Sequence, residues 1–147
     1  MQKMSIRATK LHPDAQLPRS AHGPQEDAGF DLMAVEEVTL PAGRWASVAT
    51  GLAIEIPPGY EGQVRPRSGL ARKFGVTLLN TPGTIDPGYR GEIQVLMINH
   101  GQHDYTVKPG DRIAQLIIGA YADVQWELEE QLAASTRGSG GFGSTGA

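Results

Sequence analysis

Five turn motifs that contain proline and glycine divide this chain into short segments. They occupy residues 41–43, 57–59, 81–83, 86–88 and 108–110. Proline presets φ and glycine accepts conformations that other residues avoid, so each motif marks a turn. The runs between the motifs alternate apolar with polar residues, and turns spaced about ten residues apart are typical of β-sandwiches and β-barrels. We therefore predict an all-β domain.

The individual elements follow from this alternation. We predict strands over residues 4–8, 30–33, 38–40, 45–49, 52–56, 60–64, 76–79, 91–98, 105–107, 112–120 and 124–127. Ser68–Phe74 is predicted to be helical, and Glu127–Ala134 to form at most a weak helical turn. Residues 10–28 are interpreted as an irregular arm. The length of 147 residues favours one domain, which we place at residues 1–134, followed by a flexible, glycine-rich C-terminal arm at residues 135–147.

The overall composition excludes several classes of protein. The formal net charge of −3 provides no general attraction to nucleic acid or to an anionic membrane, so we expect neither as a partner. The absence of cysteine excludes disulfides and thiolate metal sites. No apolar run approaches the roughly 20 residues that cross a bilayer, and the N-terminus lacks an apolar signal segment. We expect a soluble, intracellular protein located in the cytoplasm.

The last eleven residues, Arg137–Ala147, have a composition that suits a phosphorylated ligand with a flat ring. A guanidinium group matches phosphate oxygens, glycines let backbone amides approach an anion, and Phe142 is able to stack on a base. The alternative is a disordered Gly/Ser linker. The segment lacks the Gly-Lys-Ser/Thr sequence and the following helix of a Walker A loop.

Asn80–Glu92 contains a carboxylate whose position is restricted by its neighbours. Two Pro-Gly pairs bracket Ile85 and Asp86, so we expect a tight, hairpin-like loop between strands. A carboxylate held in such a loop accepts a proton from water and orients it, and Tyr89 places a ring beside the ligand. The alternative is an ordinary Asp-Pro-Gly turn in which the aspartate binds its own backbone.

Arg65–Ala71 has the features of an anion site. Ser68 stands where the short helix is predicted to begin and is expected to be its N-cap. Free backbone amides at a helix N-terminus, together with the Ser68 hydroxyl and Arg67, favour an anion. The alternative is a capping serine among solvated surface arginines.

Two further segments place polar side chains within apolar strands. Gln115 interrupts an apolar run, so its amide requires a partner, either a phosphate or the backbone. The adjacent Asp111 and Arg112 are expected to pair with each other near the turn. Asp31 stands in the middle of an apolar strand, where a carboxylate needs an arginine, a hydrogen-bond donor or a metal.

Taken together, five segments resemble the five sequence motifs of the trimeric dUTPases, deoxyuridine 5'-triphosphate nucleotidohydrolases. In chain order they are residues 28–34, 66–71, 80–92, 110–116 and 137–146. The resemblance extends from about Lys10 to the end of the chain, and Phe30 stands where the family often has tyrosine. It implies a jelly-roll-like β-barrel of the β-clip type, assembled as a homotrimer with shared active sites. It also implies Mg²⁺-dependent hydrolysis of dUTP to dUMP and pyrophosphate, which keeps uracil out of DNA and supplies dUMP for thymidylate synthesis.

The resemblance also assigns roles to individual residues. Asp86 corresponds to the general base, and Asp31 to a group that contacts Mg²⁺ through water. The uracil and deoxyribose contacts correspond to Asn80, Thr84, Ile85 and Tyr89. The α- and β-phosphate contacts correspond to Arg67, Ser68, Gly69 and Gln115. The arm corresponds to γ-phosphate contacts and a ring that stacks on uracil, through Arg137, Gly141, Phe142, Gly143, Ser144 and Thr145.

Other functions are weighed against this one. A related enzyme, dCTP deaminase, shares an Asp-Pro-Gly-aromatic segment but carries a glutamate about ten residues past the aspartate, where this chain has Leu96. A non-catalytic β trimer that binds nucleotide or a regulatory partner is the third alternative, and the presence of Asp86, Arg137 and Phe142 argues against it. His100 and His103 lie in a predicted turn and are most consistent with surface positions.

Overall fold

The computed structural model describes residues 3–146; Met1, Gln2 and Ala147, at the ends of the predicted domain and arm, lie outside the described residues. Within this range the chain forms short strands and a single short helix. The elements are β1 (Arg7–Lys10), β2 (Phe30–Met33), β3 (Val38–Leu40), β4 (Trp45–Ala49), β5 (Leu52–Glu55), β6 (Tyr60–Arg65), α1 (Ser68–Phe74), β7 (Val76–Leu78), β8 (Gly83–Ile85), β9 (Gln94–Asn99), β10 (Tyr105–Val107) and β11 (Arg112–Ala120). The all-β prediction with one short helix is confirmed.

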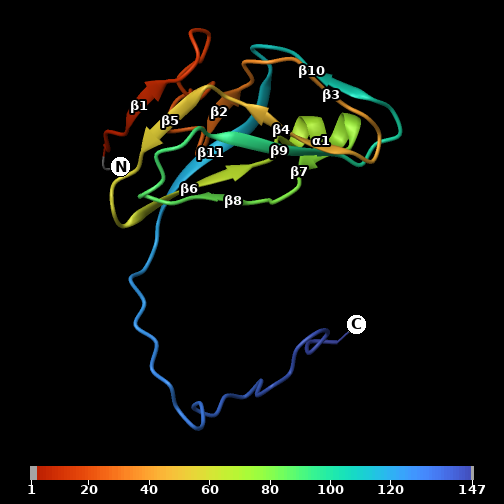
Figure 1. Cartoon of the computed structure of the whole chain (residues 1–147). Coiled ribbons are helices and arrows are strands. Elements are labelled where there is room, and N and C mark those ends of the chain that lie inside the picture. The colour runs from red at the N-terminus through yellow and green to blue at the C-terminus, as the bar shows by residue number, and fades with distance from the viewer. Residues whose placement is uncertain (1–2, 147) are drawn as a thin grey trace.

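The strands are arranged in four antiparallel sheets (Figure 1). The largest has the order β2-β11-β6-β8, and a three-stranded sheet has the order β4-β9-β7. The other two sheets are the pairs β1-β5 and β10-β3. Within residues 3–146 none of these sheets closes on itself, so the predicted closed barrel is not found, and the jelly-roll description stays a prediction.

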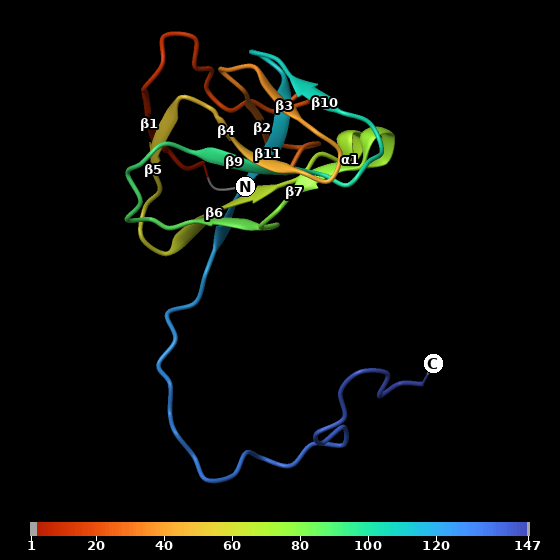
Figure 2. The ribbon, with the colours of Figure 1, turned by 45° about the vertical axis from the view of Figure 1, so that its right-hand side comes forward.

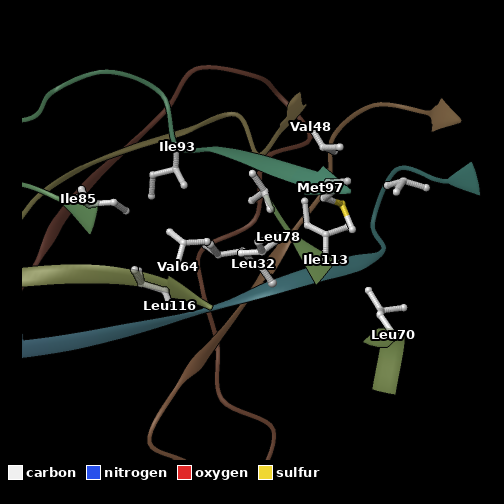
Figure 3. Packing of buried hydrophobic residues seen from close by; sticks show 14 of the residues in the cluster. Leu32, Val48, Val64, Leu70, Leu78, Ile85, Ile93, Met97, Ile113 and Leu116 are labelled. Atoms are coloured by element: carbon white, nitrogen blue, oxygen red, sulfur yellow. The ribbon is translucent and has the colours of Figure 1, made fainter. Parts of the chain in front are cut away.

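The core lies between the two larger sheets (Figure 3). In strands such as β5, β7 and β9 alternate residues point inward, as the period of two requires. Leu32 of β2 and Val64 of β6 face Met97 of β9, and these three side chains are at most 6% exposed. Ile85 of β8 is also part of this cluster and is 7% exposed, which fixes the strand that precedes Asp86.

Helix α1 begins at Ser68, whereas an N-cap at Ser68 would place the first helical residue at Gly69. Arg67 is the N-cap, in an extended conformation, and the cap has no side-chain hydrogen bond, so the prediction of Ser68 as N-cap is wrong. The helix ends at Gly75, whose φ of 68° is readily accessible only to glycine. A Cβ at Gly75 would lie 2.8 Å from the backbone nitrogen of Gly101, so close packing also requires glycine here.

Most predicted strands are confirmed, with small changes at their ends. Two regions differ from the prediction. Residues 83–85 form β8 where a loop was predicted, and residues 4–6, which were predicted to belong to the first strand, precede it. Residues 124–127 form no strand and residues 127–134 no helical turn, so both of these predictions are wrong.

Residues 122–146, which we call the tail, leave the folded body after Tyr121. The Tyr121 amide still donates to the carbonyl of Gly59, at 3.1 Å. Beyond it every described residue is exposed, including Trp126 at 90% and Phe142 at 114%. Both views show the tail running away from the sheets (Figures 1 and 2). In residues 3–146 no helix is long and apolar enough to cross a membrane.

Candidate active site

A cavity of about 350 Å³ lies where β8 of the four-stranded sheet approaches β9 of the three-stranded sheet. Five predicted site residues line it: Asn80, Thr84, Ile85, Asp86 and Tyr89. Gly83, from the same motif, also lines the cavity. The opposite wall is built from the start of β9 and its neighbours, including Glu92, Gln94, Leu96 and Ser47. These last residues were not predicted as site residues, because nothing local in the sequence shows that β9 borders the loop.

Asp86 is held at this cavity by the strand before it. Gly62 and Gln63 of β6 pair with Ile85 and Thr84 of β8, and the buried Ile85 anchors that strand in the core. The chain turns directly after Asp86, and the Tyr89 amide donates to the Asp86 carbonyl at 3.1 Å. Asp86 itself is exposed, so its carboxylate is accessible to water and to a ligand in the cavity.

Tyr89 is fixed by contacts within the same turn. Its hydroxyl donates to the carbonyl of Glu92 at 2.8 Å, which draws the ring across Gly91. A Cβ at Gly91 would lie 2.5 Å from the Tyr89 hydroxyl oxygen, so the ring occupies its position because residue 91 lacks a side chain. One face of the cavity is thereby formed by an aromatic ring.

A second cluster of predicted site residues surrounds Asp31. Its carboxylate lies 3.8 Å from Nε of Arg67 and 3.4 Å from Nη1 of Arg112, and 20% of its side chain is exposed. The expected arginine partner of this half-buried carboxylate is therefore present. The expected pairing of Arg112 with Asp111 is wrong: the Asp111 carboxylate instead accepts the amide of Lys108 at 2.9 Å and caps the turn.

Gln115 and α1 complete this cluster. Gln115 pairs in register with Asp31 on one side and Arg65 on the other, and its amide nitrogen donates to the carbonyl of Pro66 at 3.1 Å. Arg67 donates to the carbonyl of Arg112 at 3.1 Å. Two guanidinium groups and a side-chain amide thus gather beside Ser68 and Gly69, both exposed at the start of α1. This set of donors suits the oxygens of a phosphate chain.

The two clusters do not form one cavity within a single chain. Strand β6 runs from the Asp86 end of β8 toward α1, and Arg67 follows its far end. Since Ile85 pairs with Gly62, Asp86 is about level with Glu61, and at about 3.3 Å per residue the four residues from there to Arg65 at the end of β6 span roughly 13 Å. In the described part of the chain the 350 Å³ cavity is lined neither by Asp31 nor by Arg67, Ser68 or Gln115.

The predicted γ-phosphate residues form a third, separate group. Arg137, Gly141, Phe142, Gly143, Ser144 and Thr145 are all in the tail, and all are exposed. The Arg137 Nε donates to the carbonyl of Gly140 at 2.7 Å, within the tail itself. One chain therefore carries the three groups of predicted residues at three places.

The comparisons with known proteins cover nearly all of the chain. The sequence profile of the dUTPase family matches residues 15–146. The chain belongs to the dUTPase family. It is 61% identical over 144 residues to the deoxyuridine 5'-triphosphate nucleotidohydrolase of Solibacter usitatus, covering 98% of this chain and 97% of that protein. The enzyme of the same name from Clostridioides difficile is 50% identical over 142 residues, covering 97% of this chain and 98% of that protein.

Solved dUTPase structures agree with this fold. The dUTPase of Staphylococcus bacteriophage 80alpha, solved with dUPNHPP, has a TM-score of 0.90 and 27% identity, covering 99% of this chain and 100% of that chain. A coverage of 99% necessarily includes most of the tail. The G164S variant of that phage dUTPase, with dUpNHpp, gives a TM-score of 0.90 at 26% identity.

Membership of the dUTPase family also bears on the deaminase alternative. Leu96, where the deaminase alternative predicts a glutamate, lines the cavity as a half-buried apolar side chain. A leucine supplies neither a proton acceptor nor a hydrogen bond, so this wall offers no carboxylate at that position. Both the family and the local chemistry favour a nucleotidohydrolase.

Proposed function

We propose that this protein hydrolyses dUTP to dUMP and pyrophosphate, thereby keeping uracil out of DNA and supplying dUMP for thymidylate synthesis. The observation that carries the proposal is the position of Asp86: an exposed carboxylate on a turn anchored by β8, in the wall of a 350 Å³ cavity. Membership of the dUTPase family indicates that the substrate is dUTP.

Asp86 acts as the general base. Its carboxylate accepts a proton from a water molecule, and the water oxygen bonds to the α-phosphorus in line with the leaving group. The bond between the α-phosphorus and the bridging oxygen breaks, and pyrophosphate leaves with that oxygen. In phosphoryl transfer the protein contributes mainly positioning and charge neutralisation, so a fixed carboxylate is the main chemical requirement.

The cavity determines which nucleotide is accepted. Asn80, Thr84 and Ile85 present side-chain and backbone groups to the base-pairing edge of uracil, whereas cytosine carries reversed donors and acceptors. A site built for hydrogen bonding discriminates strongly, because the wrong partner leaves buried polar groups unpaired. Tyr89 lies under the deoxyribose and excludes a 2′-hydroxyl.

The phosphates are bound by the other two groups of residues. Arg67, Ser68, Gly69 and Gln115 contact the α- and β-phosphates. The tail contacts the γ-phosphate, and Phe142 stacks on the uracil; the tail residues concerned are Arg137, Gly141, Phe142, Gly143, Ser144 and Thr145. A segment without a core of its own is mobile when empty, and its closure excludes water and completes the site.

A complete site then requires more than one copy of the chain, and we propose a homotrimer with shared active sites. The separation of Asp86 from Arg67 along β6 supports this arrangement. The Trp45 end of the β4-β9-β7 sheet also supports it, because Trp45 is 58% exposed on the outward face beside Ile98, its partner in the register. An exposed tryptophan beside a second apolar side chain is compatible with a surface that another subunit covers. The tail leads away from its own body, which favours closure over a neighbouring copy.

The proposed cofactor is Mg²⁺. In the described residues no three His, Cys, Asp or Glu side chains gather into a metal site, and Asp31 is already paired with two arginines. A site with so few protein ligands fits a cation held mainly by substrate phosphates and water, which is the usual coordination of Mg²⁺. Asp31 would be the protein group nearest to the water shell of the ion. When bound, Mg²⁺ neutralises charge on the phosphate oxygens.

The test is pyrophosphate release by the purified protein with Mg²⁺ and dUTP, dCTP, dTTP or UTP. We expect release from dUTP alone, and its loss in Asp86→Asn. Ammonia released from dCTP would favour the deaminase, and binding of dUTP without either product would favour a non-catalytic binding protein.

A further inference from the structure

We infer that Arg90, which is outside the predicted site, is a positioning residue for Asp86. The inference rests on the proposed role of Asp86 in dUTP hydrolysis. Arg90 follows Tyr89 in the turn, and its side chain folds back onto the turn's own backbone. Its Nη1 donates to the carbonyl of Pro87 at 2.6 Å and to the carbonyl of Tyr89 at 3.1 Å.

These two carbonyls lie on either side of Gly88, the most adaptable point of the turn. A Cβ at Gly88 would meet nothing within 4 Å, so packing does not hold this residue. Glycine also leaves the backbone free to change conformation. By binding the carbonyls before and after Gly88, one guanidinium group fixes the two peptide planes that close the turn.

The direction of the Asp86 carboxylate depends on this backbone. Within residues 3–146 the carboxylate has no intramolecular hydrogen bond or ion pair that orients it. Its backbone is tied to the turn by the bond from the Tyr89 amide to the Asp86 carbonyl. Loosening the turn at Pro87 and Tyr89 therefore changes where the carboxylate points.

Arg90 is itself oriented by an acidic side chain on another strand. Its Nη2 lies 3.4 Å from Oε1 of Glu55, at the end of β5. Arg7 of β1 binds the same carboxylate with two nitrogens: its Nε lies 2.9 Å from Oε2 and its Nη2 lies 2.9 Å from Oε1. We call Arg7, Glu55 and Arg90 the arginine network. It connects the turn to the β1-β5 sheet, and so the turn is supported from outside the cavity.

The three contacts of residue 90 require an arginine side chain, and a lysine would not make all of them. A guanidinium group donates in several fixed directions, so one side chain reaches two carbonyls and a carboxylate together. A lysine at this position donates from a single point and satisfies only part of the set. We therefore expect Arg90→Lys to retain part of the function that Arg90→Ala loses.

The experiment compares turnover with nucleotide binding. A displacement of about 1 Å at a reacting group costs up to about a hundredfold in rate. We expect Arg90→Ala to lower kcat about ten- to a hundredfold, and to leave the Kd for a non-hydrolysable imido analogue of dUTP within about threefold. Arg90→Lys should give an intermediate kcat. Arg7→Ala is the matched comparison: it removes the other arginine of the network but leaves both carbonyl bonds of Arg90, so kcat should fall clearly less than in Arg90→Ala.

A double-mutant cycle separates positioning from general support of the fold. If Arg90 acts through Asp86, its replacement has little further effect on the residual rate of Asp86→Asn, and the two losses are not additive. Additive losses, or an Arg90→Ala enzyme with wild-type kcat, would overturn the inference. So would loss of analogue binding in parallel with kcat. If wild type does not hydrolyse dUTP at all, the proposed function fails instead.

Discussion

Adding one methyl group at Gly91 is the most selective way to test the role of Tyr89. The new Cβ would lie 2.5 Å from the tyrosine hydroxyl oxygen and 2.6 Å from Cζ, whereas ordinary contacts begin near 3.4 Å. The ring must therefore move by about 1 Å, which breaks its hydrogen bond to the Glu92 carbonyl. Since the ring is 45% exposed, it can move outward without disturbing the core.

The expected cost to folding is small and the cost to function is larger. One lost hydrogen bond at a partly exposed site destabilises the fold by about 1 kcal/mol. If Tyr89 forms the floor of the sugar site as proposed, its displacement by about 1 Å should lower kcat/KM for dUTP by up to about a hundredfold. Because the displaced ring no longer excludes a 2′-hydroxyl, the ratio of kcat/KM for dUTP over UTP should fall as well.

The assay is pyrophosphate release from both nucleotides, with a thermal melt to check folding. Gly88→Ala is the matched control, because its Cβ would meet nothing within 4 Å in the same turn. We expect that control to keep wild-type discrimination. A folded Gly91→Ala enzyme that separates dUTP from UTP as well as wild type does would refute the role given to Tyr89.

Three further outcomes are expected. Asp86→Asn should bind dUTP but lose turnover by roughly 10²–10⁴-fold, the range for a general base, and surviving turnover measured by pyrophosphate release would exclude that role. Truncation after Ser135 should leave the thermal melt unchanged, because the tail contributes nothing to the core, and should abolish most of the activity. Full activity of the truncated protein would show that the tail has no role in the site. The His22 backbone amide, followed by the His22 side chain, lowers the pKa of Asp27 below its ordinary 3.8. Ionised Asp27 therefore favours the folded state; this contribution is present above about pH 4 and is lost as the pH falls through the lowered pKa. Acid unfolding of Asp27→Asn, followed by circular dichroism, should be less steep in that range, and identical curves would show that the interaction is irrelevant to stability.

The sequence predicted those elements whose pattern is local. Trp45–Ala49 and Arg112–Ala120 are short, mainly apolar segments that follow turns containing proline and glycine, which predicts strands, and both have the predicted bounds. Strand β8 was missed because Gly83–Ile85 is only three residues long and lies between two Pro-Gly turns. Its pairing with β6 is a tertiary interaction that no local pattern reveals.

The errors in the candidate site have the same origin. Arg112 pairs with Asp31, 81 positions away, and not with its neighbour Asp111, because the register of β11 with β2 brings the two side chains together. Val124, Trp126 and Leu128 alternate as a strand does, but within the described residues the tail has no neighbouring strand to bond with. A strand needs a partner for its backbone groups, so alternation alone does not produce one.

The cavity around Asp86 was predicted in part. Asn80, Thr84, Ile85 and Tyr89 were found because they belong to one continuous motif. The wall formed by β9 and the network through Arg90 were not, since they depend on strands brought together by the fold.

The central claim is that a working site is assembled from groups on different copies of the chain. It is tested most directly by mixing two inactive variants, full-length Asp86→Asn and a wild-type chain truncated after Ser135, with subunit exchange under mild denaturation. Sites that combine the carboxylate of the truncated chain with the tail of the full-length one should then hydrolyse dUTP, and we predict that activity reappears on mixing. Exchange proven by mass spectrometry, without any recovery of pyrophosphate release, would contradict the account.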